Sequence, residues 1–380
     1  MSGSKRIRPA VVGVGTTTYG VLPDHDADSL GLWAMREALA DCGLTVADID
    51  GLFLHRITDY QKFVRVTGMK PRVATALPPQ GRMMGVSLQM AASAIMSGAA
   101  DVVAVVYGND GRSAGARYGG KEDRYATGAE QLWFPYGMTS PGAVHALMFQ
   151  RYMREFGARP EQLGAISMAF RHHASLNPHA VMRKPITLED YLNAPFICEP
   201  LRRLDYCLIN DGGVAMILTS PERARDLKQK PVYMRGYAMS SRLAEGEVSP
   251  DYGRSNMQRV ASRVFPMADV KREDVDALMI YDNFTPTVLF ALEGFGFCKV
   301  GEGGPFVENG RLELGGALPI NTSGGHLSES YMQGWNLNTE AVRQLRGECG
   351  ERQVRDARNI QYIGAGPVST SIIYSSEPHP

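Results

Sequence analysis

The sequence contains few cysteines and no pattern by which they would pair. The five cysteines among 380 residues are odd in number and have no C-x-x-C spacing: Cys42, Cys198, Cys207, Cys298 and Cys349. A disulfide framework usually has an even number of cysteines, and a structural zinc site usually has closely spaced ligands. We therefore expect free thiols, no metal site and a reducing compartment, the cytoplasm.

Excess charge and long apolar segments are also absent. Forty basic and forty acidic side chains give a formal net charge of zero, so no surface for nucleic acid or for an anionic membrane is predicted. No run of about 18 apolar residues occurs, and residues 1–6 lead directly into a strand-like segment, so we expect neither a membrane span nor a secretory signal. Gly13 and Gly15 lack the third glycine of a G-x-G-x-x-G motif, which argues against a dinucleotide-binding loop.

Apolar residues at helical spacing alternate along the chain with short, continuous apolar runs that are typical of buried strands. Together they predict an α/β protein with a sizeable core. We expect strands within residues 8–15, 47–55, 98–108, 210–219, 231–238, 273–281 and 359–364. We expect helices at residues 28–42, 88–98, 140–156, 159–175, 188–193 and 220–228, and one that starts near residue 331 and runs to residue 345. Residues 109–136 are rich in glycine and arginine, and their length favours a functional loop over a simple connection.

The second part of the chain repeats the pattern of the first. Residues 273–281 match residues 47–55 in residue type after the first position, and the helix and strand at 335–364 correspond to those at 88–107. A repeat of this length predicts two similar α/β halves. We place them at residues 1–228, with a loop insertion at about 109–200, and at residues 229–380. Such halves usually have their active site between them.

One polar stretch stands out in the second half: Asn321-Thr-Ser-Gly-Gly-His-Leu-Ser-Glu-Ser-Tyr-Met-Gln-Gly-Trp335. It follows a short apolar run and leads into a helical pattern. One interpretation is a capped loop, in which Ser328 or Ser330 begins the helix. The other is a tight glycine turn that points amide donors into a cleft beside a histidine and a tyrosine. The local sequence leaves both open.

Five motifs follow one another along nearly the whole chain. They are Gly85-Val-Ser-Leu-Gln89 with Ser97-Gly-Ala-Ala-Asp-Val-Val103, Asp211-Gly-Gly-Val-Ala-Met-Ile-Leu-Thr-Ser220, Tyr281-Asp-Asn-Phe284, Asn321-Thr-Ser-Gly-Gly325 and Ile363-Gly-Ala-Gly366. In this order they resemble the motifs of the thiolase superfamily, most closely those of the sterol-carrier-protein-type thiolases. The resemblance implies an α/β thiolase fold, in which two pseudo-repeated halves form a five-layered αβαβα core. It also implies a homodimer.

The catalytic positions of that family are altered here. A thiolase carries an acyl group on a cysteine thiolate at the N-terminus of a buried helix, where the helix dipole favours the anion. This position is Met84. The positions of the family histidine, of its second cysteine and of the residue that begins the Tyr281 motif hold Tyr331, Tyr362 and Tyr281. Acyl transfer through a thioester to the protein is therefore not expected.

Tyrosines in a CoA-ester pocket still permit proton chemistry. A phenol has an ordinary pKa of about 10, and a nearby positive charge or helix N-terminus lowers it. Retro-aldol cleavage of a β-hydroxyacyl-CoA needs a base, stabilisation of an enolate and an acid, but no covalent nucleophile. We expect Tyr281 and Tyr331 to exchange the protons. The enolate would be stabilised by the amides of the Gly324-Gly325 turn and of the turn from Gly364 to Gly366.

Four segments resemble the thiolase-like aldolases of bacterial steroid side-chain degradation: Tyr281-Asp-Asn-Phe-Thr-Pro286, Gly301-Glu-Gly-Gly-Pro-Phe306, Gly324-Gly-His-Leu-Ser-Glu-Ser-Tyr331 and Ile363-Gly-Ala-Gly366. These enzymes split a hydroxylated side-chain CoA ester into a ketone and a short acyl-CoA. The resemblance implies a bulky, steroid-like acyl-CoA substrate, no covalently bound cofactor and a small accessory protein with an OB-fold and a zinc ribbon, assembled as a heterotetramer. It does not give the side-chain length, and it does not say which tyrosine is the base.

Other site residues have a structural interpretation beside the functional one. Tyr362 either takes part in catalysis or packs against the glycine loop, and His326 either orients a tyrosine or bonds locally. Met84 and Asp282 line the substrate site by resemblance, although Asp282 is better suited to holding backbone or a partner than to catalysis. His55, His145 and three of the cysteines (Cys198, Cys207 and Cys298) are expected to be structural. Four basic loop residues are candidates for CoA phosphates: Arg112, Arg117, Lys121 and Arg124.

Two other functions fit the missing cysteine. One is a partner-dependent thiolase-type acyltransferase for an aromatic or branched acyl-CoA. The other is a non-catalytic subunit that binds lipid or acyl-CoA. Tyrosines at these particular positions favour the enzyme, because a pocket without catalytic function has no need of acidic hydroxyl groups there.

Overall fold

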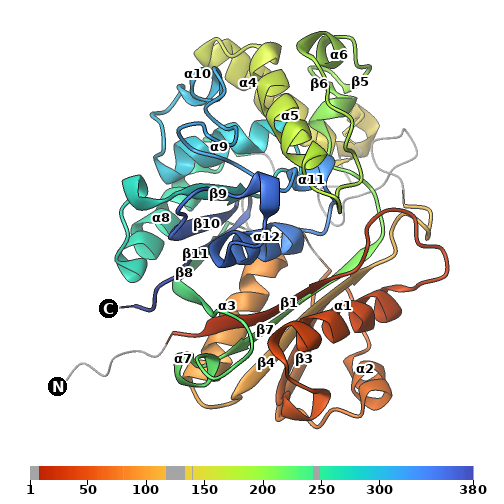
Figure 1. Ribbon diagram of the computed structural model, residues 1–380. Helices are drawn as coiled ribbons and strands as arrows, with labels where there is room; N and C mark the ends of the chain where they lie inside the picture. Colours follow the sequence, from red (N-terminus) through yellow and green to blue (C-terminus); the bar gives the residue numbers. More distant parts are fainter. Residues whose placement is uncertain (1–7, 80, 117–132, 139, 243–248, 380) are drawn as a thin grey trace.

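Nearly all strands of the molecule belong to one large sheet. The computed structural model describes residues 8–79, 81–116, 133–138, 140–242 and 249–379. Within them the sheet has nine strands in the order β3-β2-β4-β7-β1-β8-β11-β10-β9, and β5 and β6 form a separate pair (Figure 1). The strands are β1 (Ala10–Thr16), β2 (Gly51–His55), β3 (Val73–Leu77), β4 (Val102–Asn109), β5 (Phe196–Cys198), β6 (Leu201–Arg202), β7 (Gly212–Thr219), β8 (Val232–Ser241), β9 (Ala277–Ile280), β10 (Asn359–Gly364) and β11 (Val368–Ser375).

The strand directions follow the same pattern on both sides of the β1–β8 contact. β2 is parallel to β4, β4 is antiparallel to β7, and β7 is antiparallel to β1. Likewise β9 is parallel to β10, β10 is antiparallel to β11, and β11 is antiparallel to β8. β3 lies parallel beside β2, and an isolated parallel bridge between Leu278 and Ile320 occupies the corresponding place beside β9. The division of the chain at residues 228 and 229 stays a prediction.

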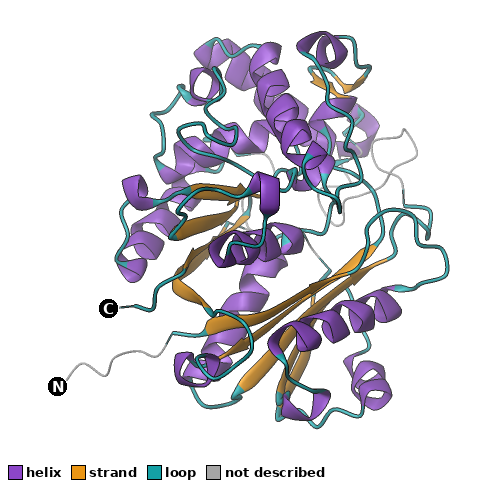
Figure 2. Cartoon of the chain, viewed as in Figure 1, coloured by secondary structure: helices purple, strands orange, loops and turns teal. Residues whose placement is uncertain are grey.

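The helices lie in three layers, separated by the two parts of the sheet (Figures 1 and 2). The outer helices on one side are α1 (Ala27–Cys42), which packs on β1, β4 and β7, and α2 (Tyr60–Thr67). On the other side α8 (Arg254–Ala268) packs on β8 and β11, and α9 (Thr285–Phe295) packs on α8. Between them α3 (Met83–Met96) and α12 (Trp335–Arg346) contact strands of both parts. These five layers are those expected from the sequence.

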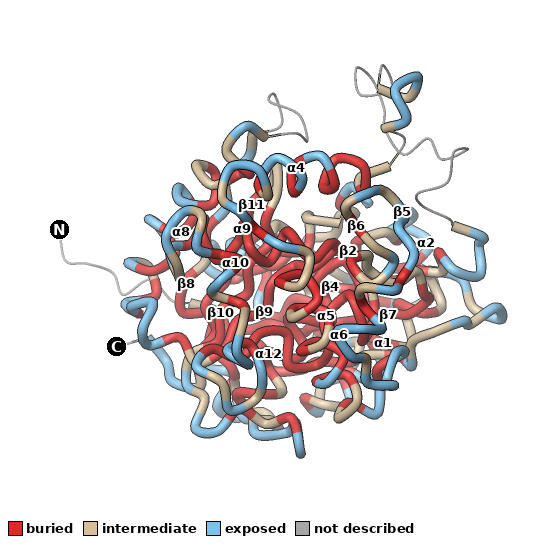
Figure 3. Tube along the Cα trace, turned by 90° about the horizontal axis from the view of Figure 1, so that it is seen from above, coloured by how far each residue is buried: buried red, intermediate tan, exposed pale blue. Residues whose placement is uncertain are grey.

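Burial on both faces explains the continuous apolar strands. Residues 102–107 of β4 have no solvent-exposed surface, because α1 covers one face and α3 the other. The middle helix α3 is equally apolar around its circumference, with Met84, Leu88 and Ala92 fully buried. The buried centre of the molecule is visible in Figure 3.

A helical lobe packs on the outer helix α9. It contains α4 (Pro141–Phe156), α5 (Pro160–Ser175) and α6 (Leu188–Leu192), together with the β5–β6 pair (Figure 1). α4 and α5 contact α9, and α5 also contacts α10 (Gly303–Phe306) and α11 (Gly325–Ser328). The remaining short helix, α7 (Pro221–Ala224), contacts β1.

Several element predictions were wrong in their limits. The helix expected from residue 331 begins at Trp335, because Gly334 is its N-cap at a φ of 91°. Neither Ser328 nor Ser330 caps it. The helix predicted at 88–98 starts at Met83, and the one predicted at 220–228 covers only Pro221–Ala224. Nine of the helices and strands named above were not predicted: α2, α8, α9, α10, α11, β3, β5, β6 and β11.

In the part of the chain that the structure describes, no helix combines the length and the hydropathy needed to cross a membrane. The cytoplasmic location stays a prediction.

Candidate active site

Two tyrosine hydroxyls meet in the interior. Tyr281 directly follows β9, where its amide donates to the carbonyl of Ile363 at 2.8 Å. Tyr331 follows α11 in the turn that precedes α12. The two phenol oxygens lie 2.7 Å apart, which is a short hydrogen bond in which either atom can donate. Tyr281 is only 2% exposed, whereas Tyr331 is half-buried, so the pair leads from the core towards an accessible surface.

Gly81 brings the backbone before α3 against both hydroxyls. A Cβ atom added to Gly81 would lie 2.1 Å from the Tyr281 oxygen and 3.1 Å from the Tyr331 oxygen. Only a residue without a side chain fits there. Sequence reasoning did not identify Gly81, since no local pattern marks a glycine that closes on residues so distant along the chain.

The His326 ring packs against both tyrosines. Its centroid lies 4.7 Å from that of Tyr281 and 5.1 Å from that of Tyr331, in edge-on contacts. The amide of Gly334 donates to Nε2 at 2.9 Å, so this nitrogen is the unprotonated one. Burial lowers the pKa of His326 to about 3, which keeps the ring neutral. The histidine therefore supports the ring positions of the pair.

Asp282 holds the start of the turn that carries His326. Its carboxylate accepts from the amides of His326 at 2.9 Å and of Leu327 at 3.2 Å. Oδ1 also lies 3.3 Å from Nδ1 of His326. Burial raises the pKa of Asp282 well above its usual range, although these amides oppose the shift. The carboxyl group thus fixes the backbone from Gly325 to Leu327, as the structural interpretation of Asp282 requires.

The glycines of the predicted turns are needed for close packing. Gly324 and Gly325 have φ values of 105° and 61°, in the left-handed region that favours glycine. An added Cβ would lie 2.6 Å from the Ala174 side chain at Gly324 and 2.3 Å from Asp282 Oδ2 at Gly325. The Gly324 amide already donates to the carbonyl of Asn321 at 2.8 Å. It is therefore occupied in this conformation and does not point at an empty site.

Tyr362 and Met84 meet on the other side of Tyr281. A Cβ added to Gly334 would lie 2.7 Å from the Tyr362 hydroxyl, 3.2 Å from Met84 Cε and 3.3 Å from a ring carbon of Tyr281. The Tyr362 hydroxyl is buried and has no hydrogen-bond partner among the described residues, and burial raises its pKa. The same hydroxyl lies 3.1 Å from the corresponding position on Gly364.

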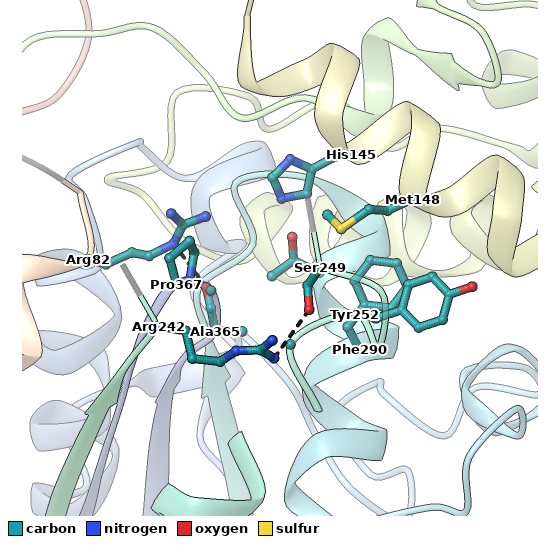
Figure 4. Close-up of a pocket in the computed structure, with 12 residues that line it drawn as sticks. Arg82, His145, Met148, Arg242, Ser249, Tyr252, Phe290, Ala365 and Pro367 are labelled. Carbon is teal, nitrogen blue, oxygen red and sulfur yellow. Dashed lines mark hydrogen bonds between the residues drawn. The ribbon is translucent and has the colours of Figure 1, made fainter. Parts of the chain in front are cut away.

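A cavity is lined by Arg82, the residue that follows Gly81, although neither tyrosine of the pair lines it. It is partly open to solvent, and the space between its walls, open solvent included, is about 520 Å³ (Figure 4). Met148, Tyr252 and Phe290 give it an apolar wall, and Arg82, Arg242 and His145 contribute polar groups. Arg82 directly follows Gly81 and therefore links the cavity to the phenols. An apolar cavity with a few polar groups is the usual form of a small-molecule site. Sequence reasoning missed both arginines, because isolated charges without a motif give no signal.

The cavity is also bounded by the last glycine turn. Ala365 and Gly366 line it, and Gly366 has a φ of 146°. A Cβ there would lie 2.1 Å from Nε of Arg82. His145, expected to be structural, lines the same cavity and packs on Phe284 in a tilted ring contact, with ring centroids 4.3 Å apart.

Asn210 fixes the backbone of Tyr331. Its Oδ1 accepts from the Tyr331 amide at 2.9 Å, and its Nδ2 donates to the Ser330 hydroxyl at 2.7 Å. Asn109 at the end of β4 donates in turn to the carbonyl of Asn210 at 2.8 Å. Asn210 stands next to the Asp211 motif, which is the signal that could have indicated it.

The other sequence candidates lie elsewhere or outside the described residues. Arg112 uses its backbone amide to bind the carboxylate of Asp211 at 2.7 Å. Arg117, Lys121 and Arg124 lie outside the described residues. His55 is buried and accepts from the Trp335 indole at 2.9 Å. Among the described residues no group of three or more His, Cys, Asp or Glu side chains could hold a metal ion.

Comparisons with known proteins show which family the chain resembles. Residues 240–373 match the family model described as "Thiolase C-terminal domain-like". The chain is 37% identical to a 17-hydroxy-3-oxo-4-pregnene-20-carboxyl-CoA lyase of Mycobacterium tuberculosis, over 89% of this chain and 91% of that one. It is 36% identical to a steroid side-chain-cleaving aldolase of Thermomonospora curvata, over 95% and 96%. The solved structure of an Ltp2-ChsH2(DUF35) aldolase superposes with a TM-score of 0.87 at 32% identity, over 97% of both chains.

The fold and these relatives define the protein as a carbon–carbon lyase built on the thiolase fold. The chain belongs to the thiolase superfamily, in its group of thiolase-like aldolases. The predicted fold class and the prediction of a lyase are thereby confirmed, and the non-catalytic subunit is excluded.

Proposed function

We propose that this lyase cleaves a β-hydroxyacyl-CoA with a bulky, steroid-like acyl group into a ketone and a short acyl-CoA. The observation that carries the proposal is the 2.7 Å contact between the Tyr281 and Tyr331 hydroxyls, beside a position where Met84 replaces the nucleophile of a thiolase. One relative is named as a steroid side-chain-cleaving aldolase and another as a lyase of 17-hydroxy-3-oxo-4-pregnene-20-carboxyl-CoA, which supports the substrate class.

The tyrosine pair is suited to moving one proton in each direction. In the proposed reaction the pair takes the proton from the β-hydroxyl group, whose oxygen becomes the ketone oxygen. The electron pair of the broken carbon–carbon bond passes into the thioester as an enolate. The pair then returns a proton to the α-carbon. No acyl group is transferred to the protein, and the CoA of the substrate remains on the short product.

In this proposal the turn from Gly364 to Gly366 stabilises the enolate. Ala365 and Gly366 line the same cavity as Met148, Tyr252 and Phe290. The Gly324 amide, in contrast, already donates to the carbonyl of Asn321. Backbone amides that are fixed before the reaction stabilise an oxyanion at little cost in reorganisation. We therefore assign this role to the turn from Gly364 to Gly366 and a positioning role to Gly324 and Gly325.

We also propose that the chain works as a homodimer joined to a small accessory protein with an OB-fold and a zinc ribbon, in a heterotetramer. The solved aldolase with a TM-score of 0.87 is a complex of Ltp2 with ChsH2(DUF35), which supports an accessory partner. CoA enters only as part of the substrate, and no covalently bound cofactor is required by the chemistry above.

Single-atom deletions in the two phenols test the function. In Tyr281→Phe and Tyr331→Phe, loss of the proton-transfer group is expected to lower kcat by about 10²- to 10⁴-fold. Tyr60→Phe removes a hydroxyl from the outer helix α2, where the side chain is 37% exposed, and serves as the matched control. Circular dichroism checks that all three variants fold. Wild-type rates in both active-site variants would rule out the tyrosine mechanism.

A further inference from the structure

Arg82 occupies the junction between the cavity and the tyrosine pair. It is the N-cap residue of α3 and follows Gly81, whose α-carbon faces both phenol oxygens. Its side chain lines the cavity beside Ala365 and Pro367 (Figure 4). A cationic side chain thus lies between the backbone that contacts the phenols and the wall of the cavity.

A hydrogen bond and the space left by a glycine define the position of the guanidinium group. Nε of Arg82 donates to the carbonyl of Ala365 at 3.1 Å. Gly366 leaves the space for the group, because a Cβ there would lie 2.1 Å from Nε and 2.5 Å from Cζ. Gly366 is therefore required by Arg82 as well as by its own φ of 146°. A planar side chain fixed in this way presents its charge at a constant position.

The buried phenols need a positive charge if one of them is to ionise. Burial raises the pKa of Tyr281 and of Tyr362, while the charge of Arg82 acts in the opposite direction on both. Cys207 adds to the rise at Tyr281, and Asp282 adds to it at Tyr362. The hydrogen bond from Tyr331 assists Arg82 at Tyr281. A charged neighbour in such a site favours the charged form of the partner.

We infer that Arg82 is a positioning residue of this active site, whose fixed guanidinium charge balances the phenolate that forms in the Tyr281–Tyr331 pair during cleavage. The inference rests on the proposed function for its kinetic consequences. Its geometric basis, the junction of Gly81, Arg82 and Gly366, is independent of the substrate.

The other cavity arginine provides the contrast. Arg242 lies on the same cavity, but Nη1 pairs with Asp251 at 3.0 Å and also contacts the Ser255 hydroxyl at 3.0 Å. Its charge is therefore offset within the cavity wall. A change at Arg242 alters the binding surface without removing the charge that acts on the phenols.

The test compares Arg82→Gln, Arg82→Lys and Arg242→Gln with the wild-type protein over a range of pH. The plot of kcat against pH has a limb in which kcat changes as the tyrosine pair ionises. In Arg82→Gln this limb should move to higher pH by about one unit or more. At neutral pH, kcat should fall by about 10²-fold. Arg82→Lys keeps the charge and should leave that limb near its wild-type pH, and added guanidinium should partly restore Arg82→Gln. Arg242→Gln should change KM and leave the limb in place.

Two outcomes overturn the inference while the proposed function stands. One is an unshifted limb in Arg82→Gln; the other is an equal loss in the lysine and glutamine variants without a pH shift, which indicates a purely structural role. If the wild-type protein does not cleave the substrate, the proposed function fails, and ultraviolet titration of tyrosinate decides about Arg82 alone. In that titration the step that is missing from Tyr281→Phe should move to higher pH in Arg82→Gln, and an unmoved step would contradict the inference.

Discussion

Gly81→Ala is the smallest change that should disable the tyrosine pair. The added methyl group would lie 2.1 Å from the Tyr281 oxygen, whereas real Cβ atoms essentially never come closer than 3.0 Å to another heavy atom. The phenol must therefore move by about 1 Å, and a displacement of that size near reacting groups can cost about 10²-fold in rate. Overpacking of this kind usually costs about 1–3 kcal/mol of stability.

The assay is kcat/KM for cleavage together with the thermal unfolding temperature. Gly164→Ala is the matched control, because its methyl group crowds the ring of Tyr191 at 2.9 Å in the helical lobe. It should lose some stability and keep its rate. The change at Gly81 should lower kcat/KM by about 10²-fold while the protein remains folded.

A double variant separates the clash from a general effect. In Gly81→Ala combined with Tyr281→Phe the colliding oxygen is gone, so the alanine should add little to the loss caused by phenylalanine alone. Two results would refute the reasoning. These are a wild-type rate in folded Gly81→Ala, and full additivity of the two changes.

Two other predictions concern the support of the site. Asn210→Ala removes the acceptor of the Tyr331 amide, a hydrogen bond of 2.9 Å, and should lower kcat by about 10-fold or more with a cost of about 1–3 kcal/mol in stability; unchanged kcat would show that Tyr331 is held by other contacts. Burial raises the pKa of Glu329 from 4.5 to about 7, and the charge of Glu340 adds to the rise. The protonated carboxyl group therefore stabilises the fold at low pH, and this contribution is lost as the pH rises through 7. Relative to Glu329→Gln, the wild-type protein should lose about 3 kcal/mol of unfolding free energy between about pH 5 and about pH 8; a difference in urea unfolding that does not change with pH would contradict this assignment.

The parts of the fold that follow from local patterns could be predicted. The buried strand at residues 102–107 is apolar throughout, because helices cover both of its faces. Edge strands give a weaker signal: β3 is only partly buried, so its alternation is not marked. The start of α12 was misplaced because Gly334 and not a serine ends the preceding turn.

The candidate site was predictable only where a motif carries it. The order of the motifs indicated Tyr281 and Tyr331, but the 2.7 Å contact between them depends on how the chain folds. Gly81, Arg82 and Asn210 act through contacts with residues far along the chain, and no local pattern reveals such contacts. The same holds for the Gly324 amide, which was expected to face an enolate and instead donates to Asn321.

The most direct test of the central claim is product analysis by mass spectrometry in D₂O, with a steroid-like β-hydroxyacyl-CoA and no added CoA. The account predicts a ketone and a short acyl-CoA that carries one deuterium at its α-carbon, because the enolate takes its proton from the tyrosine pair, whose hydroxyl protons exchange with solvent. The reaction should be run with and without the accessory protein. A strict requirement for free CoA, or an acyl group trapped on any cysteine, would contradict the account.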